Sequence, residues 1–190
     1  MSKKVVIGIT GRTGSGKSLA CKWINTHITN VEHIDCDEIG HDVLEIPDIK
    51  TKLLNTFGNS IEENNKINRA NLGKIVFTDK DKLLQLNEIV HPKICEKVNE
   101  TIKSTNNKLI VIEGALIHYV GLEHVCNHTI CIDSPTKAII ERRPDKEIIL
   151  SKQPKANDYI NMCTHTIKNN TTIELFEKKL SQLFDRLNII

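Results

Sequence analysis

Residues 8–18 read GITGRTGSGKS, and this stretch determines the fold we expect for the chain. Its last eight residues match G-x-x-x-x-G-K-[ST], the pattern of the Walker A phosphate-binding loop. In such a loop the glycines let successive backbone N–H groups surround a phosphate, and the N-terminus of the next helix adds positive charge. We therefore expect Lys17 to reach the β- and γ-phosphates of ATP and the Ser18 hydroxyl to bind Mg²⁺.

The residues on either side of the loop support this interpretation. Residues 5–10 (VVIGIT) form an apolar run typical of a buried strand, and residues 19–24 (LACKWI) continue as an apolar-rich helix. A strand, a glycine-rich loop and a helix are the setting that the motif requires, so a chance glycine-rich turn is the weaker interpretation. We expect ATP to contact Gly11, Arg12, Thr13, Gly14, Ser15, Gly16, Lys17, Ser18 and Leu19.

The composition narrows the class of protein. A chain of 190 residues with a net charge of +2 and 4% aromatic residues fits one domain, and it does not fit a nucleic-acid binder, which needs a basic surface or stacking aromatics. No apolar run approaches the ~20 residues of a membrane span, and a core strand begins too early for a secretory signal. The six cysteines form no C-x-x-C pair, as in reduced, mostly buried thiols. We expect a cytoplasmic protein without nucleic-acid or membrane partners.

The middle of the chain is interpreted as a helical insertion. A second strand is expected at residues 31–35, and residues 38–105 are mainly helical, with polar interruptions near Asn59 and at residues 62–65. Pro92 is expected to start a new helix rather than lie within one. This segment is longer than a parallel sheet needs for a crossover, so we expect it to bind the acceptor substrate. Apolar residues recur in it at helical spacing: Leu83, Leu84, Leu86, Ile89 and Val90.

Strands return in the last part of the chain and complete a sheet. We expect strands at residues 108–113, 128–133 and 164–167, and an amphipathic helix at 172–188 with Leu175, Phe176, Leu180 and Leu183 facing inward. Alternating strands and helices predict an α/β fold of three layers around a parallel sheet. Within this single domain the core covers about residues 1–37, 106–140 and 160–190, the insertion about 38–105, and a short lid about 141–157.

Carboxylates follow several of these strands, where parallel sheets bind ligands. Asp35 and Asp37 end the second strand, which we expect beside the first, facing the γ-phosphate. Phosphoryl transfer needs a group that takes the proton of the acceptor hydroxyl, and Asp37 suits that role. Capping of the next helix is the alternative for either residue. Glu113 ends another apolar strand, where a Walker B acid belongs, and helix capping is an equal alternative.

The segment after Asp133 supplies candidate cations. Arg142 and Arg143 lie where a lid would close on the triphosphate, and their guanidinium groups are suited to stabilising the transferring phosphoryl oxygens. A solvated charged helix is the alternative for this segment.

A group of metal-type residues offers a different interpretation. His124, Cys126, His128 and Cys131 lie close together in the sequence, with His118 nearby. Their spacing is not that of a zinc knuckle, and His128 and Cys131 fall on opposite faces of an expected strand. We therefore favour structural packing for this group.

With these residues placed, the chain resembles the dephospho-coenzyme A kinase family of P-loop kinases. The resemblance spans most of the chain, and its segments occur in the family's order: residues 7–18 (IGITGRTGSGKS), 33–41 (HIDCDEIGH), 57–58 (FG), 67–72 (INRANL), 76–77 (VF), 86–94 (LNEIVHPKI), 153–154 (QP) and 167–170 (IKNN). The segments at 33–41 and 86–94 are more specific than the Walker A loop alone.

The resemblance implies ATP-dependent phosphorylation of the ribose 3′-hydroxyl of dephospho-coenzyme A. It also implies that Asp37 is the general base, assisted by Lys17, Arg142 and Arg143, and that Asn169 flanks the adenine of ATP. The acceptor pocket would involve Asp35, His41, Arg69, His91 and Glu113. We expect small-molecule substrates and a monomer or weak homo-oligomer.

Two segments depart from the family pattern. Residues 113–119 (EGALIHY) stand where the family has D-x-P-L-L-x-E, and the lid between Arg143 and Gln153 is several residues shorter than usual. Both departures concern the acceptor and the lid rather than phosphoryl transfer. A nucleoside or deoxynucleoside monophosphate kinase is therefore the alternative function, and a nucleotide-binding protein without catalysis is a third.

Overall fold

The protein folds as an α/β structure around one parallel sheet. The structure, a computed structural model, describes residues 4–189. Five strands pair in parallel in the order β2-β5-β1-β6-β7. The expected α/β fold with a central parallel sheet is therefore confirmed. The strands are β1 (Val5–Thr10), β2 (Val31–Asp35), β5 (Leu109–Glu113), β6 (His128–Asp133) and β7 (His165–Lys168).

Helices and short turns connect these strands. The helices are α1 (Lys17–His27), α2 (Cys36–Val43), α3 (Pro47–Phe57), α4 (Arg69–Val76), α5 (Lys80–Ser104), α6 (Ile117–Val120), α7 (Thr136–Arg142), α8 (Glu147–Lys152), α9 (Ala156–Met162) and α10 (Ile173–Arg186). Three 3₁₀ turns add η1 (Asn59–Ile61), η2 (Leu122–Val125) and η3 (Pro144–Lys146). A small antiparallel pair joins β3 (Glu62–Glu63) to β4 (Lys66–Ile67).

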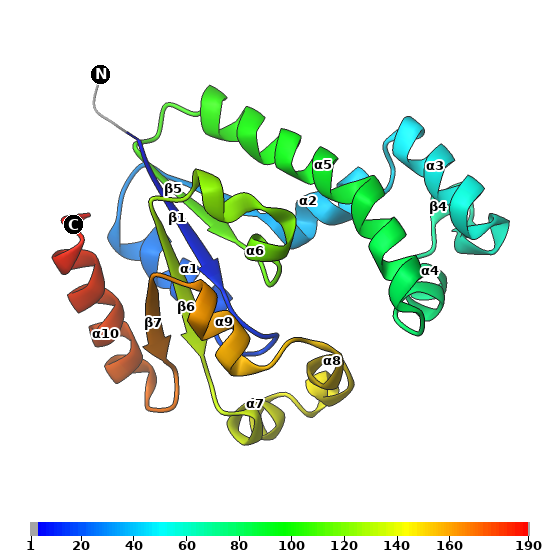
Figure 1. The fold of residues 1–190 in the computed structure, drawn as a ribbon. Helices are drawn as coiled ribbons and strands as arrows, with labels where there is room; N and C mark the ends of the chain where they lie inside the picture. Colours follow the sequence, from blue (N-terminus) through cyan, green and yellow to red (C-terminus); the bar gives the residue numbers. More distant parts are fainter. Residues whose placement is uncertain (1–3, 190) are drawn as a thin grey trace. The chain divides into compact units, whose positions relative to one another are not determined.

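Helices cover both faces of the parallel sheet. The amphipathic helices α1 and α10 pack on one face, where Ile7, Ile9 and Ile130 of the strands meet Phe176 and Leu180 in a fully buried core. On the other face α6 lies against β1 and α9 lies against β6. Figure 1 shows this three-layer arrangement, with the loop between β1 and α1 at the carboxyl end of the sheet.

The strand order differs from the expectation in one respect. The second strand, β2, does not lie beside β1, because β5 lies between them and pairs with both. Burial explains this order: all five residues of β5 are buried, whereas β2 carries the polar residues Glu32 and His33 and occupies the edge. As a result Glu113 lies directly next to the end of β1, opposite Ile9, and Asp35 is one strand further away.

The chain divides into two compact units, which we describe separately. The first contains the parallel sheet and runs to Asp35 and again from Ser104 onward, and the second is Cys36–Lys103. The second unit consists of α2 to α5 with the β3–β4 pair. Its buried side chains include Val43, Leu53, Ile61 and Leu72.

The long helix α5 contradicts the expectation for Pro92. Pro92 lies inside this 25-residue helix instead of starting a new one. Proline removes one backbone hydrogen bond and crowds the preceding turn, which is costly in a helix interior. The buried residues Val90, Ile94 and Val98 recur at every fourth position through the proline, so one packed face holds the helix on both sides of it.

Two leucines that the sequence assigned to apolar helix faces are exposed. Leu175 is 49% exposed at the start of α10 and Leu84 is 60% exposed in α5, although Phe176, Leu180 and Leu183 are buried as expected. Leu175 lies in the first turn of α10, where Ile173 is exposed as well. Among residues 4–189, none of the helices combines the length and the hydropathy that crossing a membrane requires.

The cysteines are all free thiols. Cys21, Cys36 and Cys131 are buried, whereas Cys95, Cys126 and Cys163 are partly exposed. Half of them, rather than most, are therefore fully inside the protein.

Candidate functional site

The glycine-rich loop between β1 and α1 has the backbone shape that its sequence requires. Gly11, Gly14 and Gly16 have φ angles of 140°, 73° and 110°, in the region that favours glycine. A Cβ atom on Gly11 would collide with the backbone oxygen of Ile132, and one on Gly16 would collide with the side-chain amide of Asn169. Both positions therefore need glycine for conformation and for space.

The loop combines a buried cation with an unpaired hydroxyl. Lys17 is 9% exposed, and its Nζ donates to the backbone oxygens of Gly11 and Arg12 at 3.2 and 3.4 Å. Within residues 4–189, the Ser15 hydroxyl is one of few buried side-chain oxygens without a hydrogen-bond partner. A buried cation, an unpaired donor and a helix N-terminus together fit an anion such as a phosphate group.

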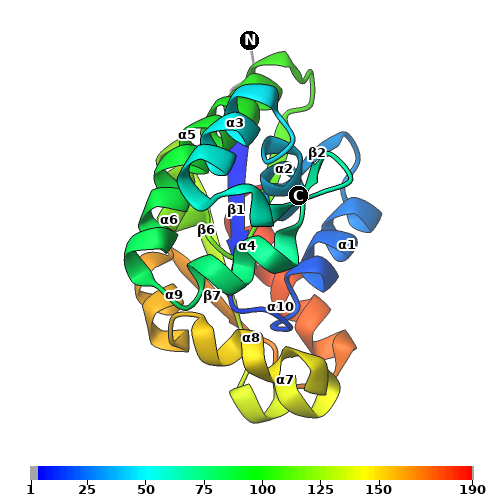
Figure 2. The same ribbon diagram turned by 90° about the vertical axis from the view of Figure 1, so that its right-hand side faces the viewer.

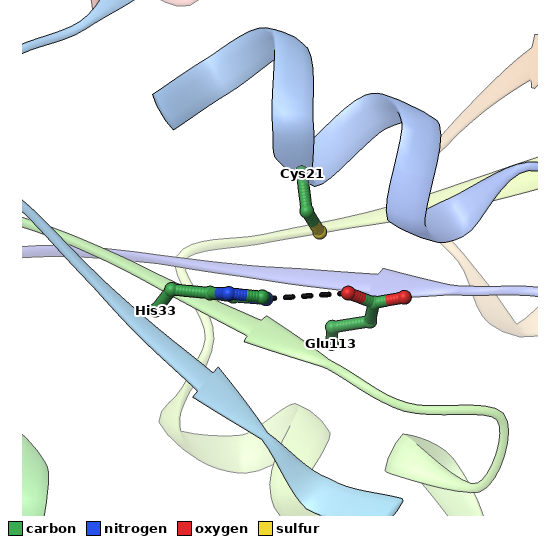
Figure 3. Close-up of side chains that lie close together, drawn as sticks. All are labelled: Cys21, His33 and Glu113. Carbon is green, nitrogen blue, oxygen red and sulfur yellow. Dashed lines mark ion pairs between the residues drawn. The ribbon is translucent and has the colours of Figure 1, made fainter. Parts of the chain in front are cut away.

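Beside the loop, the carboxylate of Glu113 lies close to three polar side chains, those of Ser18, His33 and Cys21. The Ser18 hydroxyl donates to Oε1 of Glu113 at 2.8 Å, and Nε2 of His33 lies 3.2 Å from Oε2. Figure 3 shows that Cys21 of α1 points toward the same carboxylate. Glu113 thus connects the loop to β2. A serine hydroxyl next to a carboxylate is the hard oxygen chemistry that suits Mg²⁺.

These neighbours set the ionisation of Glu113. Burial alone would raise its pKa, but hydrogen bonds from His33, Ser18 and Cys21, with the charge of Lys17, outweigh burial and hold the pKa at about 2. The hydrogen bond to Glu113 raises the pKa of His33. Burial, together with the Glu113 charge, raises the pKa of the Cys21 thiol well above its usual range. Glu113 is therefore a carboxylate at any physiological pH.

The sequence interpretation missed His33 and Cys21 as neighbours of Glu113. A signal for His33 was present in the pattern: it lies two residues before Asp35 on β2, hence on the same face of the strand. For Cys21 no such local signal exists, because its contact depends on how α1 packs on the sheet.

A second network supports the loop from the ends of β6 and β7. The side chain of Asn169 donates to the backbone oxygen of Ser15 at 2.8 Å, and the Ser134 hydroxyl donates to the backbone oxygen of Asn169 at 2.8 Å. Arg142 donates to the Ser134 hydroxyl at 2.5 Å, and Arg12 donates to the Ser134 backbone oxygen at 2.8 Å. Ser134, at the centre of this network, was not among the site residues predicted from the sequence.

Two neighbouring arginines have different surroundings. Arg142 takes part in the network around Ser134, whereas Arg143 forms an exposed ion pair with Asp145 at 3.0 Å. Hydrogen bonds from Arg143 and Lys146 hold the pKa of Asp145 well below its usual range. In this structure only Arg142 of the two is bonded to the residues that support the loop.

The segment from α7 to α9 begins just after Ser134 and includes Arg142 of this network (Figure 2). Gln153 joins the segment to the loop, since its side-chain oxygen accepts from the backbone N–H of Thr13 at 2.8 Å. A cavity of about 590 Å³ opens here, within the size range of small-molecule sites. Its lining includes Arg12, Thr136, Leu150 and Gln153.

The remaining predicted residues lie at the end of β2 and in the second unit. Asp35 is the last residue of β2 and lies opposite Glu113, and Asp37 is exposed in the first turn of α2. His41 belongs to α2, Arg69 is the first residue of α4, and His91 lies in α5. The structure thus distributes the last three over separate helices of one unit. The acid in the first turn of α2 also suits the helix dipole, the structural alternative for Asp37.

The histidine and cysteine residues of the segment 118–131 have separate partners. His118 contacts Cys163 at 3.3 Å, Cys126 donates to the backbone oxygen of Leu122, and His128 lies 3.4 Å from His165. In the part of the chain that the structure describes, three or more metal-type ligands converge at Cys21, His33 and Glu113 instead.

Comparison with known proteins identifies the family. The family model described as dephospho-CoA kinase (CoaE) matches residues 5–174. The chain belongs to the dephospho-CoA kinase family. A dephospho-CoA kinase of Fusobacterium nucleatum is 30% identical over 96% of this chain and 98% of its own length. A dephospho-CoA kinase of Lactobacillus johnsonii is 32% identical over 95% of this chain and 97% of its own length.

Solved structures show the same fold. A Thermus thermophilus protein superposes with a TM-score of 0.80 at 22% identity, covering 98% of this chain and 99% of its own. A dephospho-CoA kinase from Campylobacter jejuni superposes with a TM-score of 0.61 at 23% identity, covering 96% of this chain and 97% of its own. A shikimate kinase from Bacteroides thetaiotaomicron superposes with a TM-score of 0.56 at 14% identity, covering 95% of this chain and 98% of its own. The dephospho-CoA kinase family thus shares its P-loop architecture with other small-molecule kinases, and membership confirms the resemblance found in the sequence.

Proposed function

We propose that this protein transfers the γ-phosphoryl group of ATP to the ribose 3′-hydroxyl of dephospho-coenzyme A, giving coenzyme A and ADP. One observation carries the proposal: a phosphate-binding loop with Ser18 bonded to Glu113 occurs in a chain that matches the dephospho-CoA kinase family from residue 5 to residue 174. Family membership supports the identity of the acceptor, and the phosphate-binding loop supports the phosphoryl-transfer chemistry.

The donor nucleotide would be held by the loop. Backbone N–H groups of residues 11–16 and the unpaired Ser15 hydroxyl would bind the phosphate oxygens, while Lys17 would exchange its present bonds to Gly11 and Arg12 for the β- and γ-phosphates. Ser18 and Glu113 would hold Mg²⁺, which would neutralise negative charge on the phosphate groups of ATP. Leu19 would border the nucleotide, and Asn169 would flank its adenine.

The transfer step would be divided among three side chains. Asp37 would accept the proton of the 3′-hydroxyl group while the oxygen of that hydroxyl attacks the γ-phosphorus. Arg142 and Lys17 would stabilise the negative charge on the transferring oxygens. The Ser134 bond places Arg142 in the network of the loop, which favours it over Arg143 for this role.

The acceptor would be bound by residues that follow β2 or belong to the second unit. Arg69, His41 and His91 offer positive or neutral donors to the phosphate oxygens of dephospho-coenzyme A, and Asp35 and Glu113 offer acceptors to its hydroxyl groups. We further propose a cytoplasmic enzyme that acts as a monomer or weak homo-oligomer on small molecules.

A panel of acceptors tests the proposal. The purified protein would be supplied with ATP and Mg²⁺, and ADP release would be measured with dephospho-coenzyme A, with nucleoside and deoxynucleoside monophosphates, and with no acceptor. We expect turnover with dephospho-coenzyme A alone. Turnover of the monophosphates without dephospho-coenzyme A would identify a nucleoside monophosphate kinase, and ATP binding without any transfer would identify a binding protein.

A further inference from the structure

Three potential metal ligands converge from three separate elements beside the phosphate-binding loop. Cys21 comes from α1, His33 from β2 and Glu113 from β5 (Figure 3). The sulfur, one imidazole nitrogen and one carboxylate oxygen all lie within 4.8 Å of one another. Cys21 and Glu113 are buried, and the side chain of His33 is 30% exposed, so one edge of the group is open to solvent.

The spacing of these atoms is close to that of a tetrahedral zinc site. Bond lengths of about 2.0–2.3 Å from zinc to nitrogen, oxygen and sulfur place neighbouring ligands about 3.3–3.6 Å apart. Nε2 of His33 and Oε2 of Glu113 already lie 3.2 Å apart. Because the three atoms lie within 4.8 Å of one another, the sulfur needs a shift of at most about 1.5 Å to complete the triangle around such an ion. A rotation about the Cα–Cβ bond of Cys21 provides movement on this scale.

We propose that Cys21, His33 and Glu113 bind a thiophilic divalent cation of the Zn²⁺ class, and that its binding suppresses phosphoryl transfer. The ion replaces the thiol proton: Zn²⁺ and the Cys21 thiol give a zinc–sulfur bond and one proton released to solvent. The imidazole nitrogen and the carboxylate oxygen each donate a lone pair, and water from the exposed side of His33 completes four ligands.

The ligand set separates this site from the magnesium site proposed at Ser18. Mg²⁺ binds oxygen ligands in an octahedral arrangement, whereas sulfur and imidazole select zinc and similar transition metals. Glu113 belongs to both groups: Oε1 accepts from Ser18, and Oε2 faces His33. A zinc ion on Oε2 withdraws electron density from the carboxylate and places a second positive charge next to the position of Mg²⁺. Mg²⁺ binding is therefore weakened when the triad is occupied.

Spectroscopy with Co²⁺ tests the site without reference to catalysis. Co²⁺ would be titrated into the nucleotide-free full-length protein, and the near-ultraviolet charge-transfer band of a cobalt–thiolate bond would be followed, with Zn²⁺ added afterwards to displace it. We expect one Co²⁺ per chain, with a thiolate band that Zn²⁺ abolishes. Cys21→Ala should remove the band, and His33→Ala should weaken cobalt affinity by at least about 10-fold, the lower limit seen when only an outer partner of a ligand is lost.

Matched variants distinguish this triad from other thiols. Cys163→Ala and His165→Ala remove a cysteine and a histidine from other parts of the same unit, and each should keep the band and the affinity of the parent. Circular dichroism of every variant checks that it is folded. The absence of a thiolate band in the parent, or its loss in Cys163→Ala with retention in Cys21→Ala, would overturn the proposal. The first result would leave the group as a hydrogen-bond network around a buried carboxylate.

The inhibitory effect has its own measurement, which rests on the proposed kinase activity. Zn²⁺ would be titrated into the reaction at fixed Mg²⁺ and ATP, and we expect the concentration for half inhibition to rise at least about 10-fold in Cys21→Ala and His33→Ala. Equal inhibition of the parent and both variants would overturn the inhibitory role. If no acceptor is phosphorylated by the parent, the proposed function fails, while the cobalt band still tests the metal site.

Discussion

The two compact units present their candidate residues in different ways. In the sheet unit, Lys17, Ser15 and Asn169 are buried, and the side chains of Lys17 and Asn169 donate to backbone oxygens of the loop. In the helical unit, His41 and Arg69 are exposed on separate helices. The proposed donor site is therefore pre-organised, with fixed dipoles around the phosphate position, whereas the proposed acceptor residues would lose side-chain entropy on binding. Substitutions in the two units should therefore change different kinetic constants.

The largest effect is expected from Lys17→Ala. In the proposed mechanism the buried ammonium group binds ATP and stabilises transfer, so both ATP affinity and turnover should fall without it, with a loss of about 10³-fold in kcat/KM for ATP. Steady-state kinetics and ATP-binding calorimetry measure the two effects. Lys22→Ala changes an exposed lysine of the same helix and serves as the control. A Lys17→Ala enzyme with the ATP affinity of the parent would contradict the assignment of the donor site.

Asp37→Asn should act on turnover alone. The amide keeps the shape of the side chain but cannot take the hydroxyl proton, so kcat should fall by about 10²-fold while the dissociation constant of ATP stays unchanged. Asp42→Asn, an exposed residue of the same helix, is the matched control and should resemble the parent. Near-normal kcat in Asp37→Asn would exclude Asp37 as the base and favour the helix-dipole role.

Substitution of Arg142 should have a smaller effect on kcat/KM for ATP, and the neighbouring Arg143 serves as its control. Because Arg142 is bonded to Ser134 in the loop network and is proposed to stabilise the transferring oxygens, Arg142→Ala should lower kcat/KM for ATP by at least about 10-fold, less than the loss of the buried Lys17. Arg143 is held by Asp145 in an exposed ion pair, and such pairs contribute little, so Arg143→Ala should remain within about 3-fold of the parent. The opposite ranking in side-by-side kinetics would mean that the segment rearranges when nucleotide binds.

The smallest effect concerns stability against pH. The pKa of Glu113 is lowered from 4.5 to about 2, so its stabilising contribution is present above pH 4.5 and is lost as the pH falls toward 2. The pKa of His33 is raised from 6.5, so its contribution is present below pH 6.5 and is lost as the pH rises through its folded value. The pair should stabilise the fold most between these two limits.

Urea unfolding at a series of pH values measures this contribution. Glu113→Gln should flatten the acid side of the profile, and Glu88→Gln, which changes an exposed residue of α5, should leave it as in the parent. Identical profiles for the parent and Glu113→Gln would show that the His33–Glu113 pair contributes no pH-dependent stability.

Features fixed by neighbouring residues could be predicted from the sequence. The glycine spacing of residues 11–16, the apolar strand runs and the amphipathic residues Phe176, Leu180 and Leu183 depend on local conformation and periodicity, and the structure contains the corresponding loop, strands and helix. The family resemblance added the acceptor, which no local pattern specifies.

Features that depend on distant contacts could not be predicted in this way. The hydrogen bond from Asn169 to Ser15 joins residues 154 positions apart, and Cys21 meets Glu113 only because α1 packs over β5. The position of β5 between β1 and β2 follows from competition among strands for the interior of the sheet. For Pro92, the packed face of α5 outweighs a local preference that favours a break.

Locating the transferred phosphoryl group is the most direct test of phosphoryl transfer to dephospho-coenzyme A. Dephospho-coenzyme A and ATP would be incubated with the purified protein and Mg²⁺, and the product would be characterised by ³¹P nuclear magnetic resonance and mass spectrometry. We expect coenzyme A, with the new phosphate on the ribose 3′-oxygen, and no such product from the Lys17→Ala protein. Unchanged dephospho-coenzyme A, together with conversion of a nucleoside monophosphate to its diphosphate in a parallel reaction, would contradict this expectation.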